Sequence, residues 1–518
     1  MKFISKLISI PFKIIFSRTT LAILSIALQL LIIVTTYKYL NDYVTMVFGF
    51  FTIISLSVVV YILNLKQNPA YKITWIIPIL VFPVFGVLIY FFIRSQPGTK
   101  EMNRKLQYNR ENTAEYLKQD AVIKELLDNT DMQTSNLVTY MNNCGGFPIY
   151  TDNDVQYFPT GEDMYIDLLD ELEKAKKYIF IETFILERGI MWNKILEILR
   201  DKVNQGVEVR VMYDGMGSIM LLPPNYPKTL HQMGIKCKKF APVKPFISTA
   251  QNHRDHRKIF VIDGEVAYNG GLNIADEYIN RKIKYGYWKD TAVKVRGKAV
   301  QNFTMMFLEL WNVSNKNNDD YEKYITNIQY DATNIQKGFV LPYSDNPLDN
   351  VEVGRQIYID LLNTARHYVH IITPYLILDN ELLTILIYTA QRGVNVKIIM
   401  PHIPDKKFVY YLGRSFYKDL IKAGVQIYEY MPGFTHAKMF VVDDEKAVVG
   451  TVNLDYRSLY LHFECGTYIY KNSVINKIEE DYQNTLKQCE LITLKNVKEY
   501  SFVKKYIGKS LRFFAPLM

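Results

Sequence analysis

The chain has 518 residues, with 61 Lys and Arg residues against 52 Asp and Glu residues and a formal net charge of +9. This length allows two or three domains, and the basic balance favours an anionic partner such as nucleic acid or an acidic lipid surface. The spacing of the four cysteines is scattered, which excludes a C-x-x-C zinc motif and a disulfide framework. They are Cys144, Cys237, Cys465 and Cys489.

The first hundred residues contain three apolar runs with no charged residue inside them, at 21–37, 43–65 and 73–93. The second and third runs are long enough to cross a hydrocarbon core of about 30 Å, and the first is borderline. A cleaved signal peptide is the alternative for the first run, but no small-residue cleavage site follows it before the next run begins. Residues 1–96 are therefore predicted to be a membrane region with two or three transmembrane helices.

The orientation of this region stays open. Lysines and arginines precede the first run and also follow the third. The positive-inside rule draws both ends toward the cytoplasm, which three crossings cannot satisfy. The amphipathic start, 1–17, and the first run are therefore candidates for segments that do not span as a simple helix. We expect a multi-pass protein of the cell membrane whose catalytic domains face the cytoplasm.

From about Phe147 the pattern becomes that of an α/β protein. Helical spacing at 163–177 leads into a buried strand pattern at 177–186, and a further helical stretch leads to a strand at 206–215. The later half repeats this order, with strand patterns at 368–377 and 393–402. Strands alternating with helices predict a mixed or largely parallel sheet with helices on its faces.

The organisation predicted after the membrane region is a linker at 97–146, a first α/β domain at 147–315 and a second at 316–518 that ends in a basic tail. The polar stretch NKNNDD at 315–320 interrupts the apolar pattern between the two domains. We interpret the domains as an internal duplication whose copies pack face to face as a pseudo-dimer.

One motif, H-x-K-x4-D-x6-G-x2-N, occurs in each copy. Five matched positions at fixed spacing make it a specific signal, and finding it twice makes chance a poor explanation. The candidate catalytic residues are His256, Lys258 and Asp263 in the first motif and His436, Lys438 and Asp443 in the second, and the motif asparagines are Asn273 and Asn453.

The spacing within a motif predicts how its side chains point. Residues two apart on a strand face the same side, so His256 and Lys258 are expected to project together. Asp263 and Gly264 form a hairpin turn signal, with the strand EVAYNG returning after it. Two such motifs facing each other would place two imidazoles between two lysines, which is a cationic pocket suited to a phosphodiester.

These groups are sufficient for phosphoryl transfer. A neutral imidazole is a competent nucleophile toward phosphorus, and a covalent intermediate divides one hard displacement into two easier ones. The second imidazole can protonate the leaving alkoxide and then deprotonate the incoming alcohol. The lysines and the motif asparagines can stabilise charge on the phosphoryl oxygens. We expect no metal and no cofactor in this chemistry.

The chain resembles the phospholipase D superfamily, and specifically the bacterial cardiolipin synthases. The resemblance covers most of the chain and is carried by NPAYKITWIIPILVFPVFG at the third apolar run, NHRDHRK before the first motif, GYWKDTAVKVRG at 286–297 and NLDYRSLYLHFE at 453–464. It implies two phospholipase D-like domains sharing one active site at their interface. It also implies His256 as the nucleophile that becomes phosphohistidine and His436 as the acid/base, with Asp290 and Glu464 as acidic partners that orient the histidines.

The reaction implied by the resemblance is transfer of a phosphatidyl group between two phosphatidylglycerol molecules, giving cardiolipin and glycerol. The partners are then phosphatidylglycerol and other membrane phospholipids rather than nucleic acid, and the oligomeric state stays open. A phospholipase D-type hydrolase is the alternative, because the motifs do not distinguish water from a lipid alcohol. A membrane scaffold with an inactive site is disfavoured by two complete motifs. The basic C-terminal stretch, 501–518, could rest on an anionic bilayer.

The remaining histidines are expected to be structural, and only His253 is close enough in sequence to His256 to line the site. For Asp263 and Asp443 a bracing role is at least as plausible as a catalytic one, because aspartates at turns commonly cap and brace the backbone.

Overall fold

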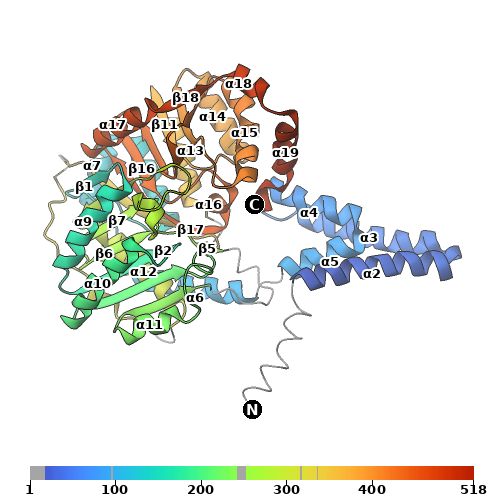
Figure 1. Ribbon diagram of the computed structural model, residues 1–518, viewed down its shortest axis with the longest axis horizontal. Coiled ribbons are helices and arrows are strands. Elements are labelled where there is room, and N and C mark those ends of the chain that lie inside the picture. The colour runs from blue at the N-terminus through green and yellow to red at the C-terminus, as the bar shows by residue number, and fades with distance from the viewer. Residues whose placement is uncertain are drawn as a thin grey trace, which may run out of the picture. The chain divides into compact units, whose positions relative to one another are not determined.

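The computed structural model describes residues 18–94, 97–241, 253–315, 318–334, 337–349 and 351–517 (Figure 1). The chain divides into an N-terminal helical unit, which extends to Glu101 and includes the C-terminal residues from Arg512, and a larger α/β unit. The predicted amphipathic start at 1–17 lies outside the described residues.

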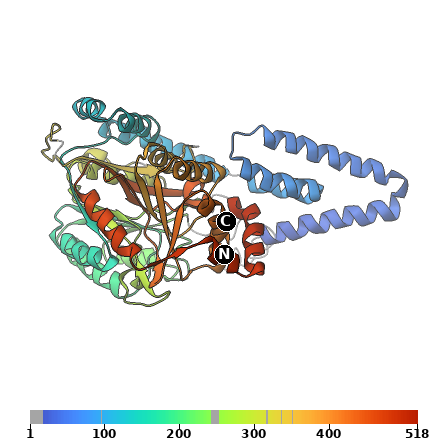
Figure 2. The same ribbon diagram turned by 90° about the horizontal axis from the view of Figure 1, so that it is seen from above.

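The N-terminal unit is built from antiparallel helices that surround a small core of Val58, Ile62, Ile79 and Tyr90. Most of its other apolar side chains face outward, as Met46 does with 74% of its surface exposed. Its helices, seen in Figures 1 and 2, are α2 (Arg18–Tyr39), α3 (Val44–Leu63), α4 (Pro69–Val81) and α5 (Pro83–Arg94).

The third apolar run does not form the single long helix that its length suggested. Helix α4 ends at Val81 and α5 begins at Pro83, because a proline lacks the N–H that would continue the helix and its ring clashes with the preceding turn. The chain folds back there, and Gly86 approaches the backbone of Ile79 too closely for any Cβ. Among the described residues, α3 is the one helix long and apolar enough to cross a membrane.

The segment predicted as a linker at 97–146 is helical. Much of it packs on the α/β unit: Asn109 donates a hydrogen bond of 2.7 Å to the carbonyl of Glu309, and Ile123 and Leu127 are buried. Its helices are α6 (Pro97–Thr113), α7 (Ala121–Thr130) and α8 (Met132–Tyr140).

The α/β unit contains two mixed sheets of matching topology, in agreement with the predicted duplication. The first sheet has the order β1-β9-β7-β6-β2-β3-β4, and the second has β10-β17-β16-β15-β11-β12-β13-β18. Three neighbouring strands are parallel in each sheet, β2-β3-β4 in the first and β11-β12-β13 in the second. The remaining neighbours that the two sheets share pair antiparallel.

The strands predicted from apolar patterns lie in the middle of these sheets. The first-half strands are β1 (Asp154–Phe158), β2 (Tyr178–Thr183), β3 (Glu208–Asp214), β4 (Lys236–Phe240), β6 (Ile259–Ile262), β7 (Val266–Gly270) and β9 (Ala292–Arg296). The second-half strands are β10 (Phe339–Asp345), β11 (Tyr368–Ile372), β12 (Asn395–Pro401), β13 (Gln426–Tyr430), β15 (Met439–Val442), β16 (Lys446–Gly450), β17 (His462–Tyr470) and β18 (Cys489–Ile492).

The helices cover both faces of the sheets, so the central strands are apolar on both sides. In β2, Ile179 and Ile181 belong to the core under the outer helices, whereas Phe180 stacks on Phe307 of the inner helix α12. The helices of the first half are α9 (Gly161–Lys174), α10 (Ile190–Asn204), α11 (Tyr226–Gln232) and α12 (Val300–Asn312). Those of the second half are α13 (Val353–Thr364), α14 (Asn380–Gln391), α15 (Lys407–Lys422), α16 (Tyr456–Tyr460), α17 (Val474–Leu486), α18 (Leu494–Glu499) and α19 (Phe502–Phe514).

Helix α12 joins the two halves, and all thirteen of its residues are buried. It contacts β2, β6 and β7 of the first sheet and β10 of the second. A helix that is enclosed all round belongs to a core rather than to a surface, so the two halves share one interior.

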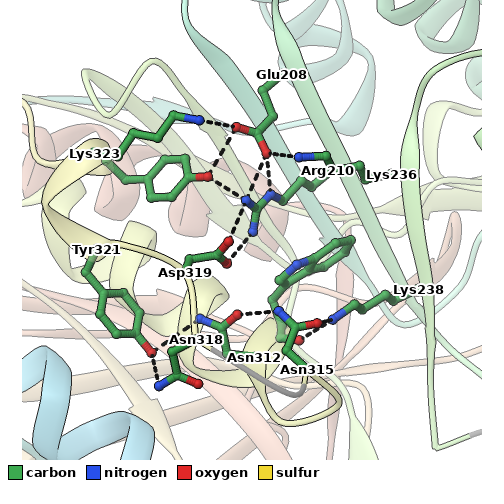
Figure 3. Close-up of polar contacts among 12 residues, drawn as sticks. Glu208, Arg210, Lys236, Lys238, Asn312, Asn315, Asn318, Asp319, Tyr321 and Lys323 are labelled. Carbon is green, nitrogen blue, oxygen red and sulfur yellow. Dashed lines mark hydrogen bonds and ion pairs between the residues drawn. The ribbon is translucent and has the colours of Figure 1, made fainter.

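Ion pairs connect the segment after α12 to the first sheet (Figure 3). Arg210 of β3 donates to both carboxylate oxygens of Asp319, at 2.6 and 3.1 Å, and also binds Glu208. Burial would raise the pKa of Glu208, but the bonds from Lys236 and Arg210 outweigh it and lower this pKa to about 2. Asp319, which lies within the predicted polar boundary, is therefore held against the first sheet.

Candidate active site

Each motif histidine follows a short strand that pairs with the other half. Strand β5 (Arg254–Asp255) runs parallel to the start of β17, and β14 (Gly433–Thr435) runs parallel to β8 (Tyr287–Lys289). The N–H of His256 donates to the carbonyl of Phe463 at 2.9 Å, and the N–H of His436 donates to the carbonyl of Lys289 at 2.7 Å. Each histidine is thus fixed by the opposite half.

The residue after each of these two carbonyls carries the carboxylate that binds the imidazole: Glu464 follows Phe463, and Asp290 follows Lys289. Nδ1 of His256 lies 2.9 Å from either carboxylate oxygen of Glu464, and Nδ1 of His436 lies 2.7 Å from Oδ2 of Asp290. Both carboxylates are fully buried. A carboxylate on Nδ1 fixes the ring orientation and leaves Nε2 for the chemistry. The pairing is crossed, because each half supplies the histidine to one pair and the carboxylate to the other.

The two pairs differ in their protonation. Burial raises the pKa of Glu464 to about 8, although Lys258 opposes this. Burial also acts to raise the pKa of Asp290, but the interaction with His436 outweighs it, so that pKa is lowered. Burial lowers the pKa of His256 well below its usual value and that of His436 to about 4. Before substrate binds, both imidazoles are therefore neutral at neutral pH, and Asp290 is the ionised partner.

Each motif lysine binds the backbone carbonyl of its own histidine. Nζ of Lys258 donates to the carbonyl of His256 at 2.6 Å, and Lys438 makes the same bond to the carbonyl of His436. Burial lowers the pKa of Lys258 to about 8 and that of Lys438 to about 7. The residues from His256 to Lys258 lie between β5 and β6 rather than inside a strand.

The two motif aspartates make their bonds at the far end of the hairpins. Asp263, with a left-handed φ of 55°, begins the predicted β6–β7 turn. Its carboxylate accepts from the N–H groups of Lys176, Lys177 and Tyr178, at 2.7 to 2.9 Å. Asp443 makes the equivalent three bonds at the start of β11. These contacts brace the hairpin that carries each motif, and a direct catalytic role for either aspartate stays a prediction.

The motif asparagines are not equivalent. Asn273 accepts from the N–H of Ile185 at 2.9 Å and donates to the hydroxyl of Tyr278 at 2.6 Å, so it is engaged within its own half. The side-chain oxygen of Asn453 is buried and has no hydrogen-bond partner among the described residues. A role for either one toward phosphoryl oxygens stays a prediction, and it suits Asn453 better.

Rings that the sequence did not single out enclose the two imidazoles. Phe184 and His462 lie against His256, with centroids 5.1 and 5.5 Å away. Tyr278 and Trp288 lie against His436, at 5.4 and 5.5 Å. Of the other histidines, it is His462 that reaches His256, whereas Nδ1 of His253 bonds the carbonyl of Leu461. The available signal for His462 was its position two residues before Glu464.

Comparisons with known proteins show which family the chain resembles. A family model described as "Cardiolipin synthase, PLD-like domain" matches residues 168–311 and 358–486, and one described as "Phospholipase_D-nuclease N-terminal" matches 53–94. The chain is 47% identical to an uncharacterized protein of Streptococcus mutans, over 89% of this chain and 99% of that one. It is 31% identical to a cardiolipin synthase of Alkalihalophilus pseudofirmus, over 90% and 92%.

Among solved structures, a phosphatidylserine synthase of Haemophilus influenzae matches with a TM-score of 0.56 and 17% identity. The match covers 75% of this chain and 98% of that one. At this identity the match shows a shared fold.

Proposed function

This chain belongs to the cardiolipin synthase family of phospholipase D-like proteins, and on that premise we propose how its two halves divide a phosphatidyl transfer between them. The overall reaction joins two phosphatidylglycerol molecules into cardiolipin and releases glycerol. The observation that supports the division is the crossed pairing of His256 with Glu464 and of His436 with Asp290. Two imidazoles that are fixed in this way can act in sequence on one phosphorus atom.

In the first step, Nε2 of His256 attacks the phosphorus of one phosphatidylglycerol. A P–N bond forms as the P–O bond to the terminal glycerol breaks. His436, which takes up a proton at Nε2 when the anionic phosphodiester binds beside it, gives that proton to the departing alkoxide and becomes neutral again. In the second step, His436 removes a proton from a hydroxyl of another phosphatidylglycerol. That oxygen attacks phosphorus, the P–N bond breaks, and His256 returns to its neutral form.

The carboxyl partners of the two histidines support one order of their roles. An acid/base imidazole becomes imidazolium during the cycle, and a negative partner stabilises that charge. Asp290, whose pKa is lowered mainly by His436 against the effect of burial, provides it. Glu464, whose pKa burial raises to about 8, provides less negative charge to His256. This difference supports His256 as the nucleophile and His436 as the acid/base.

We also propose that the N-terminal unit holds the site at a membrane with its catalytic unit facing the cytoplasm. The observations that support attachment are the exposed apolar surface of α2–α5 and the length of α3, Val44–Leu63. Helix α19 adds a second contact, because Phe502, Val503 and Tyr506 are exposed beside lysines. A basic amphipathic helix of this kind lies in the interface of an anionic bilayer.

The product assay tests the proposed reaction. We expect the full chain in detergent micelles to convert labelled phosphatidylglycerol into cardiolipin and glycerol in equal amounts. Lipid products would be separated by chromatography, and glycerol would be measured in the aqueous phase. Phosphatidic acid as the dominant product would replace this proposal with the hydrolase, in which water accepts the phosphatidyl group.

The affinity for an anionic phosphodiester is expected to fall as pH rises from 6 to 9. The two motif lysines are protonated below their pKa values of about 8 and about 7 and lose positive charge above them. A charged hydrogen bond contributes roughly 1.5–3 kcal/mol, so the loss should be at least about 10-fold. The measurement is the dissociation constant of short-chain phosphatidylglycerol at constant ionic strength. Lys258→Met should flatten the profile, and an equally steep profile in this variant would contradict the assignment.

A further inference from the structure

One position breaks the symmetry between the two halves. Trp288 and His462 each come two residues before the carboxylate that binds a motif histidine. Their rings lie 5.5 Å from the neighbouring imidazole with planes at 45° in both cases, Trp288 beside His436 and His462 beside His256. The two residues therefore occupy equivalent places, and one half has an indole where the other has a third imidazole.

The His462 imidazole is buried without being satisfied. The residue is 9% exposed, and neither ring nitrogen has a hydrogen-bond partner among the described residues. Its Nδ1 lies 3.8 Å from Oε1 of Glu464, which is too far for a good bond. An unsatisfied buried polar group costs about 1–3 kcal/mol. In the other half Trp288 leaves one ring nitrogen, Nε1, buried without a partner among the described residues, whereas His462 leaves two.

We propose that His256, His462 and Glu464 form a binding site for a divalent transition-metal ion of the zinc class. Each residue offers one donor atom, and the three atoms lie within 4.8 Å of one another. Two imidazoles and one carboxylate are a common ligand set for zinc. Bond lengths of about 2.0–2.2 Å require the three side chains to draw together around the ion.

Thr451 favours metal binding at this site, and Lys258 opposes it. The hydroxyl of Thr451 donates to Oε2 of Glu464, and an outer bond of this kind orients a ligating carboxylate. The charge on Lys258 opposes a second cation, so the site is expected to bind zinc with moderate affinity and to favour imidazole-seeking metals over magnesium or calcium.

The site would regulate the transferase, and this consequence rests on the proposed function. An ion held by His256 restrains the imidazole that is to attack phosphorus. Zinc at the site is therefore expected to prevent phosphohistidine formation, and a chelator is expected to reverse the inhibition. The other half has Trp288 in the equivalent place and cannot form the same site.

Metal binding can be measured without any assay of activity. We expect the full chain to bind Co²⁺ with the intense visible absorption of a low-symmetry site, and Zn²⁺ to displace it in a stoichiometry of one per chain. His462→Asn and Glu464→Gln should each weaken zinc binding by at least about 10-fold. His402→Asn is the matched control, since His402 pairs with Glu429 outside the site. Equal zinc binding by wild type and both site variants would overturn the proposal.

Activity measurements then test whether zinc binding at this site inhibits the enzyme. For each variant, the fraction of its own metal-free rate that zinc removes is compared, so a lower basal rate does not confuse the result. We expect zinc to inhibit wild type and His402→Asn, and to inhibit His462→Asn only at higher concentration. Zinc binding that depends on His462 without inhibition would overturn the regulatory role alone. Absence of cardiolipin synthesis from every metal-free sample would instead count against the proposed function.

Discussion

Replacing His256 or His436 by asparagine is expected to reduce cardiolipin formation by at least about 10³-fold, which is the scale seen when a member of a nucleophile and acid/base pair is removed. Asparagine keeps a polar side chain of similar reach but can neither attack phosphorus nor exchange a proton. The two effects should not add in the double variant, because each histidine is needed for the same covalent cycle. The measurement is the initial rate of cardiolipin and glycerol release.

The two variants should differ in the intermediate that they form. With lipid-labelled phosphatidylglycerol, His256→Asn should give no labelled protein. His436→Asn should form an acid-labile labelled protein slowly and fail to pass the label on to a second lipid. His402→Asn controls for the loss of a histidine elsewhere. Label on the His256→Asn protein but not on His436→Asn would reverse the order, and full activity in either variant would remove the two-histidine mechanism.

Asp290→Asn is expected to lower the rate by about 10²- to 10⁴-fold, since the loss of a buried carboxylate that orients and stabilises an imidazolium has effects on this scale. Glu464→Gln should be milder near pH 7, because burial raises the pKa of Glu464 to about 8 and much of that carboxyl is already neutral. Asp290, whose pKa is lowered by His436 against the effect of burial, is ionised. The measurement is kcat at pH 7 for both variants.

The different pKa values of Glu464 and Asp290 also predict how the rates of the two variants depend on pH. Deprotonation of Glu464 as pH rises through about 8 should widen the difference between wild type and Glu464→Gln. The difference between wild type and Asp290→Asn should stay constant over that range. Glu197→Gln, which removes an exposed carboxylate from α10, is a suitable control. A Glu464→Gln variant slower than Asp290→Asn at pH 7 would contradict the assigned protonation states.

The repeated motif made much of the fold predictable. Because the pattern occurs twice, the duplication and the hairpin after Asp263 could be inferred from residue order. The placement of His256 and Lys258 on a strand was wrong, because they lie between β5 and β6. The crossed pairing could not be predicted from spacing, because it depends on β5 and β14 joining strands of the opposite half. His462 was overlooked for the same reason: its neighbour, His256, is distant in sequence and meets it only across the interface.

The membrane region shows another limit of sequence reasoning. Apolar length predicted one crossing for 73–93, but composition does not register where a helix ends. The proline at 83 separates α4 from α5, and the chain turns back within the run. The segment at 97–146 is the opposite case. It was predicted as a linker, but from Met102 it belongs to the α/β unit, and Ile123 and Leu127 are buried.

The sharing of one interior by two unequal copies has a consequence for how such a protein can change over time. Two identical subunits around a two-fold axis must carry the same side chain at both symmetry-related places, so a mutation beside one histidine is imposed on the other. A single chain that contains both copies is free of this constraint. The difference between Trp288 and His462 beside the two imidazoles is one that a symmetric dimer of identical subunits could not carry.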